Sequence, residues 1–425
     1  MEIIAAFKEH TPCKISNKKY KEIHYIGGIT LKKPYKKILS LLGTGVLSLG
    51  LLAGCAPPKG TGDSKVSGSQ KTNNEDIKIG LVTQLSGGGA LYGEQMKNGA
   101  QLAVDEINEA GGVDGKNLKL IVQDDQANPS ESVKVTQRLV TEQNIDAWMG
   151  TLKSSDTLTD LTITSKEDIP SFVPIAVADA ITESGYKNVF RNVSNNSLQV
   201  KALVDYILKN QPHKKIAIIA ENTDYGRGLS EAFTDDFKAG GGKVINNEFY
   251  NVGQKEFNDQ LTKIKSNKPD AIVISGLVAE GSLIVKQAKD LGMDTQFYSY
   301  GGFMGTAPID LAGKAADGLI HTEYFTPIKG DKKIEDFVTN YEKKYKKIPD
   351  SYYSAATYDA VYLYAEGIKN AGSIEGAKVN EAIRGIKNFK GVMGSISFDS
   401  TGQANTKVWI GQIQDGKQVV IHRPE

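Results

Sequence analysis

The feature that most constrains the fold is an alternation of short apolar segments with amphipathic ones. Three short apolar segments near the start have strand length: residues 77–85 (IKIGLVTQL), 119–125 (KLIVQDD) and 145–150 (IDAWMG). Apolar residues at helical spacing separate the first two and stop at Gly111-Gly112, and Asn128-Pro129 is a typical helix start before the third. Strands that alternate with helices predict right-handed βαβ units around a parallel sheet.

The same plan returns in the middle of the chain. Strands are predicted at residues 215–222, 243–250 and 270–276, and helical patterns lie between them at 229–242 and 257–267. The 425 residues suffice for two cores, since single cores stop growing near ~250–300 residues. Two copies of one plan therefore predict two lobes, each with its own sheet. Ligands of such sheets bind beyond the carboxyl ends of the strands, so we expect a site in the cleft between the lobes.

The N-terminal region has a different composition. Residues 32–37 hold four lysines, and the uncharged run that follows, from residue 38 to residue 54, is apolar up to residue 52. This run is shorter than the ~20 residues of a membrane-spanning helix and ends in small residues, so we interpret residues 32–54 as a signal peptide. Its end, LAGC, resembles the lipobox of bacterial lipoproteins. That resemblance implies cleavage before Cys55 and lipidation of the Cys55 thiol; a buried cysteine or a short transmembrane anchor is the alternative.

The segments around this signal also carry information. Residues 55–76 are rich in Pro, Gly, Ser, Lys and Asn and predict a disordered tether. Residues 1–31 do not fit a usual signal, and we hypothesise that translation starts near Leu31. Removal of residues 1–54 takes away Cys13, which excludes an intrachain disulfide in the mature protein. It also removes 9 lysines and 3 glutamates, leaving 42 positive and 47 negative side chains and a net charge of −5.

This charge balance bears on location and partners. Because the mature chain has no dominant basic block, its composition argues against a nucleic-acid partner. The signal and the lipobox together predict an extracytoplasmic protein that is attached to the cell membrane of a bacterium by a lipid anchor.

Several motifs taken together resemble a known family. They are IKIGLVTQLSGGGALYGEQMKNGAQLAVDEINEAGG, LIVQDDQANPSESV, YGRGL, ATYDAVYLYAEGIKNAG and GVMGSISFDSTGQ. In this order they resemble type I periplasmic binding proteins, and among those the branched-chain amino acid receptors of ABC importers. The resemblance runs from Ile77 to about residue 420.

The resemblance implies an α/β fold of two Rossmann-like lobes with parallel sheets, joined by a three-strand hinge. We place the crossings near Asn195, Thr322 and Phe398. Lobe 1 is then made of residues 77–195 and 323–398, and lobe 2 of residues 196–322 and 399–425. A helix predicted at residues 352–371 would return to lobe 1.

The implied function is that of a receptor. A small molecule is captured between the lobes, the lobes close, and the closed form docks on permease and ATPase subunits of the importer. The family needs no catalytic residue, cofactor or metal, and we expect a monomer.

Two pairs of residues are candidates for ligand contacts. Residues 150–162 form a loop that runs into a helix, whose N-terminus offers unpaired N–H groups and partial positive charge to a carboxylate. The resemblance implies that Ser154 binds the ligand carboxylate with Ser155 beside it; alternatively, either serine only caps the helix. Tyr92 and Tyr225 each precede a glycine in a predicted loop of their own lobe. The resemblance implies that these two rings enclose the ligand; alternatively, each packs on its own loop.

Further contacts are implied at Ala176, Val177, Leu277, Gly301 and Tyr353, although Tyr353 cannot be separated from its neighbour Tyr352 by sequence. Two of these residues depart from the family pattern. Val177 aligns with a Thr or Ser that holds the ligand, and Gly301 aligns with the acid that pairs the ligand ammonium. Burying an unpaired ammonium costs on the order of several kcal/mol. Either another acid replaces it, or the ligand has no ammonium.

Both possibilities stay open in the sequence. The acids near predicted strand ends are Asp179, Asp224 and Glu280, each of which can equally be a solvated loop charge. A glycine at position 301 would leave room beside Phe303. The resemblance makes leucine, isoleucine and valine the default ligands. Together with Val177, the room beside Phe303 supports a competing hypothesis of a bulkier or less charged ligand, such as an aromatic or keto acid, unless one of these acids reaches the ligand.

Other functions find little support in the motifs. Gly87-Gly88-Gly89 and Gly93 do not form a G-x-G-x-x-G pattern, and the chain has no P-loop, no H-E-x-x-H and no G-x-S-x-G. A ligand-sensing subunit of a signalling system would share the fold and remains an alternative. A sugar-repressor type of regulator would need a DNA-binding N-terminus where this chain has a signal, and an extracellular hydrolase is the least supported class.

The lipobox generates a first prediction. The Cys55→Ser variant should lose its lipid and leave the membrane fraction, because one cysteine is the sole attachment point in the mature chain. Stable anchoring takes more than one acyl chain, at ~0.8 kcal/mol per buried CH₂. Fractionation of cells with a labelled fatty acid measures this, and unchanged membrane association of Cys55→Ser would contradict the prediction.

Overall fold

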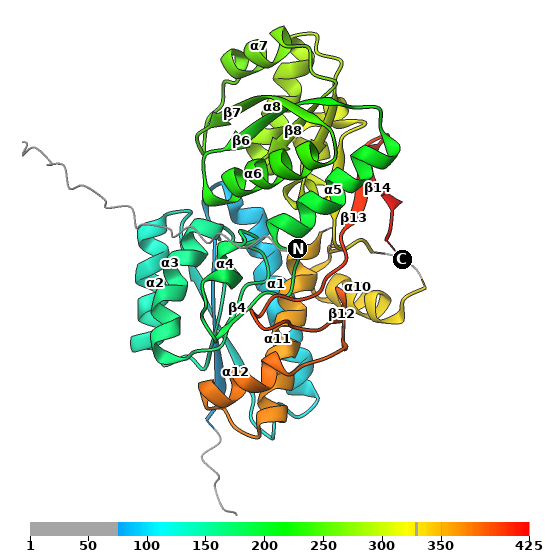
Figure 1. The fold of residues 1–425 in the computed structure, drawn as a ribbon. Coiled ribbons are helices and arrows are strands. Elements are labelled where there is room, and N and C mark those ends of the chain that lie inside the picture. Colours follow the sequence, from blue (N-terminus) through cyan, green and yellow to red (C-terminus); the bar gives the residue numbers. More distant parts are fainter. Residues whose placement is uncertain (1–74, 328–329, 350, 425) are drawn as a thin grey trace, which may run out of the picture. The chain divides into compact units, whose positions relative to one another are not determined.

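The computed structural model describes residues 75–327, 330–349 and 351–424. The predicted start near Leu31, the signal peptide, Cys55 and nearly all of the tether lie outside the described residues. Within the described ranges the chain is an α/β structure with two main sheets, as predicted (Figure 1). None of the helices in those ranges is both long and apolar enough to cross a membrane.

The sheet of lobe 1 contains five parallel strands in the order β2-β1-β3-β4-β5. Its strands are β1 (Ile77–Thr83), β2 (Leu118–Asp124), β3 (Ala147–Met149), β4 (Ser171–Phe172) and β5 (Val189–Phe190). Successive residues of β1 face opposite sides: Ile79 and Leu81 belong to one apolar core, and Val82 belongs to another. A parallel sheet is buried on both faces, which explains why β1 is apolar throughout.

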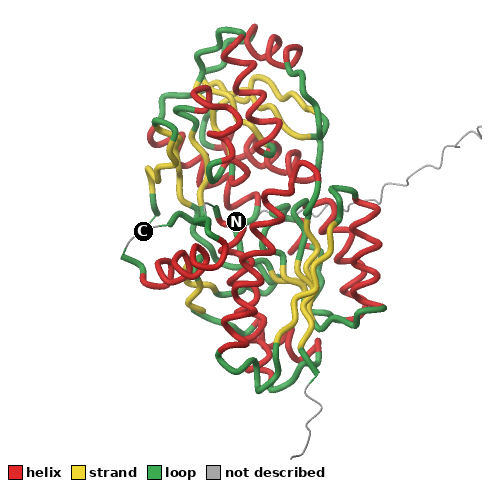
Figure 2. The backbone as a smooth tube through the Cα atoms, turned by 180° about the vertical axis from the view of Figure 1, so that it is seen from behind, coloured by secondary structure: helices red, strands yellow, loops and turns green. Residues whose placement is uncertain are grey.

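Helices cover both faces of this sheet, as Figure 2 shows. The first core joins β1 to α1 (Ala90–Glu109) and α11 (Tyr352–Ala371), and the second joins it to α2 (Pro129–Thr141) and α3 (Ser154–Thr164). The expected helix at 352–371 is confirmed, and it lies beside α1, which ends at residue 109, far back in the chain (Figure 1). The Asn128 side chain accepts hydrogen bonds from the N–H groups of Ser130 and Glu131, which confirms the predicted start of α2.

The sheet of lobe 2 has seven strands in the order β14-β13-β10-β9-β8-β6-β7. They are β6 (Lys215–Glu221), β7 (Lys243–Tyr250), β8 (Ala271–Ser275), β9 (Gln296–Ser299), β10 (Ile320–Glu323), β13 (Trp409–Gln414) and β14 (Lys417–His422). The first five run parallel to one another, whereas β13 is antiparallel both to β10 and to β14. The purely parallel sheet that the sequence predicts is therefore wrong at this edge, because Asp415-Gly416 is a tight turn and a two-residue turn can join only antiparallel strands.

This second sheet is also covered on both faces. Residues Ile216 and Ile218 of β6 pack against α5 (Asn196–Asn210) and α6 (Asp224–Ala239). Residues Ala217 and Ile219, on the opposite face, pack against α7 (Asn258–Ser266) and α8 (Val278–Asp290). The two lobes thus repeat one three-layer plan. The positions of the predicted crossings, like the lobe boundaries, stay predictions, and one of them, Thr322, lies within β10 of the lobe 2 sheet.

Shorter elements complete the described chain. The helical ones are η1 (Gly87–Gly89), η2 (Ser165–Glu167), α4 (Ala180–Glu183), η3 (Gly301–Phe303), α9 (Ala307–Ala312), η4 (Gly313–Ala316), α10 (Lys332–Tyr345) and α12 (Gly376–Arg384). A small hairpin of β11 (Phe389–Gly391) and β12 (Gly394–Ile396) belongs to the core of lobe 1 through Ile396.

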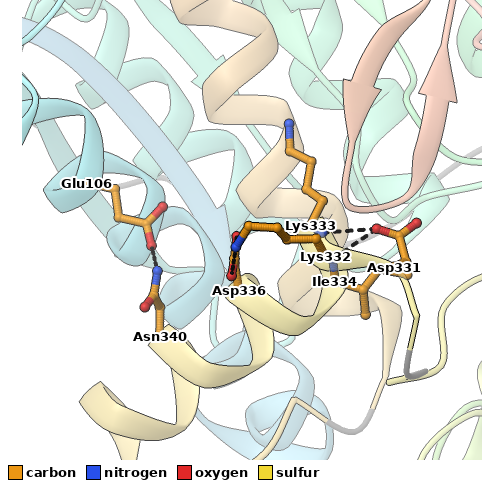
Figure 3. Close-up of polar contacts among 7 residues, drawn as sticks. All are labelled: Glu106, Asp331, Lys332, Lys333, Ile334, Asp336 and Asn340. Carbon is orange, nitrogen blue, oxygen red and sulfur yellow. Dashed lines mark hydrogen bonds and ion pairs between the residues drawn. The ribbon is translucent and has the colours of Figure 1, made fainter.

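Helix α10 is held at its start and along its length (Figure 3). The Asp331 carboxylate accepts hydrogen bonds from the N–H groups of Lys333 (3.0 Å) and Ile334 (3.4 Å), which caps the helix. Further along the helix, Asn340 donates to the Glu106 carboxylate of α1 at 2.7 Å. Because Glu106 also accepts from the Tyr362 hydroxyl of α11 at 2.9 Å, one carboxylate links three helices of lobe 1.

The tyrosine–glycine pairs lie in helices, not in the loops that the sequence predicts. Tyr92 is in the first turn of α1, and Tyr225 is in the first turn of α6. Both helices begin close to the end of the preceding strand, because a glycine in the first turn lets the helix backbone contact the backbone at that strand end. A Cβ on Gly93 would lie 1.7 Å from the Gln84 carbonyl oxygen, and one on Gly226 would lie 2.2 Å from the Glu221 carbonyl oxygen. Only glycine permits this approach, which places the tyrosine before each glycine at the strand end.

These contacts predict the effect of a single methyl group. Gly93→Ala and Gly226→Ala should each lower the free energy of unfolding by about 1–3 kcal/mol or more, because backbone carbonyls cannot move aside as a side chain does. Gly88→Ala is the matched control, since a Cβ there meets nothing within 4 Å. Chemical denaturation of the three variants checks this, and equal midpoints for all three would contradict the proposed close packing.

Candidate functional site

A cavity lies at the carboxyl ends of both sheets, where the sequence places the binding site. The residues that line it surround about 540 Å³ of space, of which the open solvent at its mouth is a part. Its lobe 1 wall is made of Leu152, Lys153, Ser154, Ser155, Ile175, Ala176, Val177, Tyr352 and Tyr353. Its lobe 2 wall is made of Gln199, Glu221, Thr223, Tyr225, Leu277, Gly301 and Gly302. Eight of the nine residues that the sequence singles out for ligand contacts are in these walls.

Ser154 occupies the start of α3 but does not cap it. The N-cap position belongs to Lys153, and no side chain caps this helix, so the alternative of a capping serine is wrong. The buried Ser154 hydroxyl oxygen instead accepts a hydrogen bond from the Ala178 N–H at 3.2 Å. The hydroxyl hydrogen is therefore directed elsewhere, and the serine can donate it to a ligand at the positively polarised helix start.

The aromatic part of the wall comes from three tyrosines. Tyr225 projects from lobe 2, and Tyr352 and Tyr353 open helix α11 of lobe 1, with ring centroids 4.4 Å apart. Burial raises the pKa of Tyr225 and of Tyr352, so both phenols stay neutral at physiological pH. Neutral rings combine an apolar face with a polar edge, which suits a ligand that has an apolar side chain and polar ends.

Tyr92 is the predicted contact that the cavity walls do not include. Its ring is buried and stacks on Tyr353, with a centroid distance of 4.6 Å and an interplanar angle of 26°. Tyr92 therefore supports the wall from behind. The sequence pattern could not show this, because it finds matching tyrosines in the two lobes without showing which ring is in front.

Glu221 is the functional candidate that sequence reasoning missed. It is the last residue of β6, is 3% exposed, and lies in the cavity wall. Burial is the main cause that raises the pKa of its carboxyl group, Glu280 raises it further, and hydrogen bonds from the Thr223 hydroxyl and the Leu277 N–H lower it. A carboxylate that ends a strand in a ligand-binding sheet was the signal that could have pointed to it.

The space predicted at Gly301 does not exist. A Cβ on Gly301 would lie 2.7 Å from the Tyr324 ring and 2.9 Å from the Met304 methyl group, so these side chains occupy the room. Phe303, expected beside that room, packs against Gly281 in the lobe 2 core. The prediction was wrong because the sequence alone does not show which side chains from other parts of the chain fill the space beside a glycine.

The three acids suggested by the sequence lie outside the cavity walls. Asp179 accepts a hydrogen bond from the Ser197 hydroxyl at 3.0 Å, and Glu280 accepts one from the Gly253 N–H at 2.8 Å. Asp224 is exposed in the first turn of α6. Among the residues described here, no group of three or more His, Cys, Asp or Glu side chains is arranged to hold a metal ion.

The fold and this cavity are those of a recognisable family. Residues 76–418 match the family model described as periplasmic binding protein. The chain belongs to this family. The expected resemblance is thereby confirmed for nearly the whole described part of the chain.

Curated relatives and solved structures of this family cover most of the binding protein. The Leu/Ile/Val-binding protein BraC3 of Rhizobium johnstonii is 31% identical over 335 residues, which is 78% of this chain and 90% of the relative. The LivJ substrate-binding protein of Streptococcus pneumoniae, solved with isoleucine, is 31% identical with a TM-score of 0.76, covering 82% of this chain and 100% of that one. The leucine-binding protein LivK of Thermotoga maritima is 28% identical with a TM-score of 0.78, and the match covers 82% of this chain and 99% of that one.

Three aspartates are buried in and near helix α3, which begins at Ser154: Asp125, Asp156 and Asp160. Burial raises the pKa of all three, that of Asp125 to about 6 and that of Asp160 to about 7, and repulsion by Asp156 adds to both shifts. Asp160 accepts hydrogen bonds from the hydroxyls of Ser132 (2.7 Å) and Thr136 (2.9 Å). The raised pKa keeps the Asp160 carboxyl partly protonated near pH 7, so less negative charge opposes the positive polarity of the α3 start.

The aspartate pKa shifts predict a pH dependence of stability. The folded pKa of Asp160 exceeds its unfolded value, so the folded state binds more protons between pH 4 and pH 7, and the free energy of unfolding falls as pH rises through this range. Asp160→Asn should flatten this slope, which is on the order of 1 kcal/mol per pH unit while the group titrates. Denaturation from pH 5 to pH 8 measures it. Exposed Asp235→Asn is the control, and parallel curves for wild type and Asp160→Asn would contradict the assignment.

Proposed function

We propose that this protein is the substrate-binding receptor of an ABC importer, and that it captures a branched-chain amino acid or a similar small solute with a carboxylate. One observation carries the proposal: a single cavity combines a serine at a helix start in lobe 1 with an aromatic residue from lobe 2. The named specificity of BraC3, and the isoleucine bound to the Streptococcus pneumoniae protein, support the ligand class.

The cavity suggests how such a ligand would be held. Its carboxylate lies at the start of α3, where Ser154 can donate its hydroxyl hydrogen and the helix supplies partial positive charge. Its apolar side chain lies against the rings of Tyr225, Tyr352 and Tyr353. Since these groups come from both lobes, the ligand favours the conformation in which the lobes are together.

The remaining steps follow from this role. The closed form docks on the permease, the ATPase subunits drive release and transport, and a lipid on Cys55 keeps the receptor at the membrane. The receptor itself catalyses no reaction. A monomer is sufficient, because one chain provides both walls of the cavity.

A second candidate ligand is an aromatic or keto acid. It would keep the carboxylate contact at Ser154, and an aromatic ring could stack among the three tyrosines of the wall. Val177, in the lobe 1 wall, offers no hydroxyl to a ligand amino group, which is the observation that favours this candidate.

A panel of ligands separates the two candidates. Leucine, isoleucine and valine should raise the melting temperature of the purified mature protein, with ~2.7 kcal/mol of stabilisation at a concentration of 100 Kd. Phenylalanine, benzoate and the keto acid of leucine are the competing ligands. Differential scanning fluorimetry measures the shifts, and the same panel on Ser154→Ala should show much smaller ones.

Each result has a clear consequence. Shifts by benzoate or the keto acid alone would favour the second candidate. If no ligand of the panel changes the melting temperature, the proposed ligand class is wrong. If Ser154→Ala binds as tightly as wild type, the carboxylate is held elsewhere.

A further inference from the structure

The charged groups of the cavity are few and lie in different lobes. Of the described residues that line it, Glu221 is the one carboxylate and Lys153 is the one side chain with a positive charge. Lys153 precedes the two serines at the start of α3, so lobe 1 presents hydrogen-bond donors and positive charge. Lobe 2 presents a negative charge at the end of β6. A ligand between the lobes thus meets opposite charges at its two ends.

The structure assigns Glu221 as the residue that binds the positive end of the ligand, an α-ammonium group. This inference rests on the proposed function and names the ligand class more narrowly: a zwitterionic amino acid in place of a deaminated or aromatic acid. It therefore reverses the preference for an aromatic or deaminated acid that Gly301 and Val177 suggest in the sequence.

Glu221 is held ready for such a partner. The Thr223 hydroxyl and the Leu277 N–H bond its carboxylate, and these residues are the N-caps of α6 and α8. Two helix starts therefore face one buried carboxylate and fix its position. Among the described residues no ion pair neutralises Glu221, and Lys153 acts on it only at longer range. A buried carboxylate without a close counter-charge gains most from a ligand that brings one.

The cavity has no second acid for this role. Gly301 provides no side chain, and its N–H donates to the Gln199 side chain at 3.4 Å. Asp179, Asp224 and Glu280 are outside the walls, as described above. A ligand with a carboxylate but no ammonium would add a second negative charge beside Glu221 with nothing to neutralise it. Repulsion within a poorly hydrated cavity would then weaken its binding.

The test compares leucine with 4-methylpentanoate, which is leucine without its amino group. By titration calorimetry on the mature protein, wild type should bind leucine at least 100-fold more tightly than 4-methylpentanoate. Glu221→Gln should weaken leucine binding by 10-fold or more and leave 4-methylpentanoate unchanged or bound more tightly, so that the difference between the ligands shrinks. A merely structural role would weaken both ligands alike.

Two controls make the result specific. Asp224→Asn removes an exposed acid three residues along the chain and should keep the wild-type affinities. Glu221→Gln should melt at or above the temperature of the ligand-free wild type, because it removes a buried carboxylate that has no close counter-charge.

The outcomes distinguish the two proposals. Equal leucine affinity in wild type and Glu221→Gln overturns the inference and leaves the proposed receptor function intact. Tight binding of 4-methylpentanoate to wild type also overturns it, because the ammonium then adds nothing. If wild type binds neither compound, the proposed ligand class falls together with the inference.

Discussion

The rest of the structure depends on one buried group, the guanidinium of Arg191. Its hydrogen bonds join segments that lie far apart in the chain. It is fully buried just after β5 and donates to the Ala178 carbonyl (2.6 Å), the Thr182 hydroxyl (2.8 Å) and the Gln403 side chain (2.6 Å). Burial lowers its pKa to about 10, so it stays charged at physiological pH. Ala178, whose carbonyl accepts from Arg191, donates its own N–H to the Ser154 hydroxyl.

These contacts reach from the cavity wall to residues near the predicted crossings. Gln403 follows the crossing predicted near Phe398, and its amide also donates to the Val193 carbonyl at 2.7 Å. At the crossing predicted near Thr322, the Thr322 hydroxyl donates to Gln199, which itself lines the cavity. Ser154, Ala178, Arg191 and Gln403 are thus joined by successive hydrogen bonds, and the contact between Thr322 and Gln199 is separate from them. Buried polar groups depend on their partners, so a change at Arg191 would disturb the position of Ser154 in the cavity wall.

Much of this architecture was predictable from local patterns, and what was missed has physical reasons. The apolar strands β1 and β6, the cap at Asn128 and the helix at 352–371 are all determined by nearby residues. The antiparallel edge of lobe 2 depends on how a distant segment returns to the sheet. The site was predicted where it follows from strand ends, as at Ser154 and Leu277. It was not predicted where stacked side chains decide which ring reaches the cavity, as with Tyr92 and Tyr353. It was also not predicted beside Gly301, where the side chains of Tyr324 and Met304 fill the space.

Ligand selectivity and lobe closure then have a common origin. A ligand shifts the equilibrium between open and closed forms only by the difference in its affinity for the two. The serine helix belongs to lobe 1, and Glu221 and Tyr225 belong to lobe 2, so a ligand with charges at both ends gains its second ionic contact only when the lobes meet. An acid without an ammonium would complete its ionic contact with lobe 1 alone and would bring unpaired negative charge toward Glu221 on closure. Such a ligand would favour the open form, and under the proposed function it would be rejected before the protein docks on a permease.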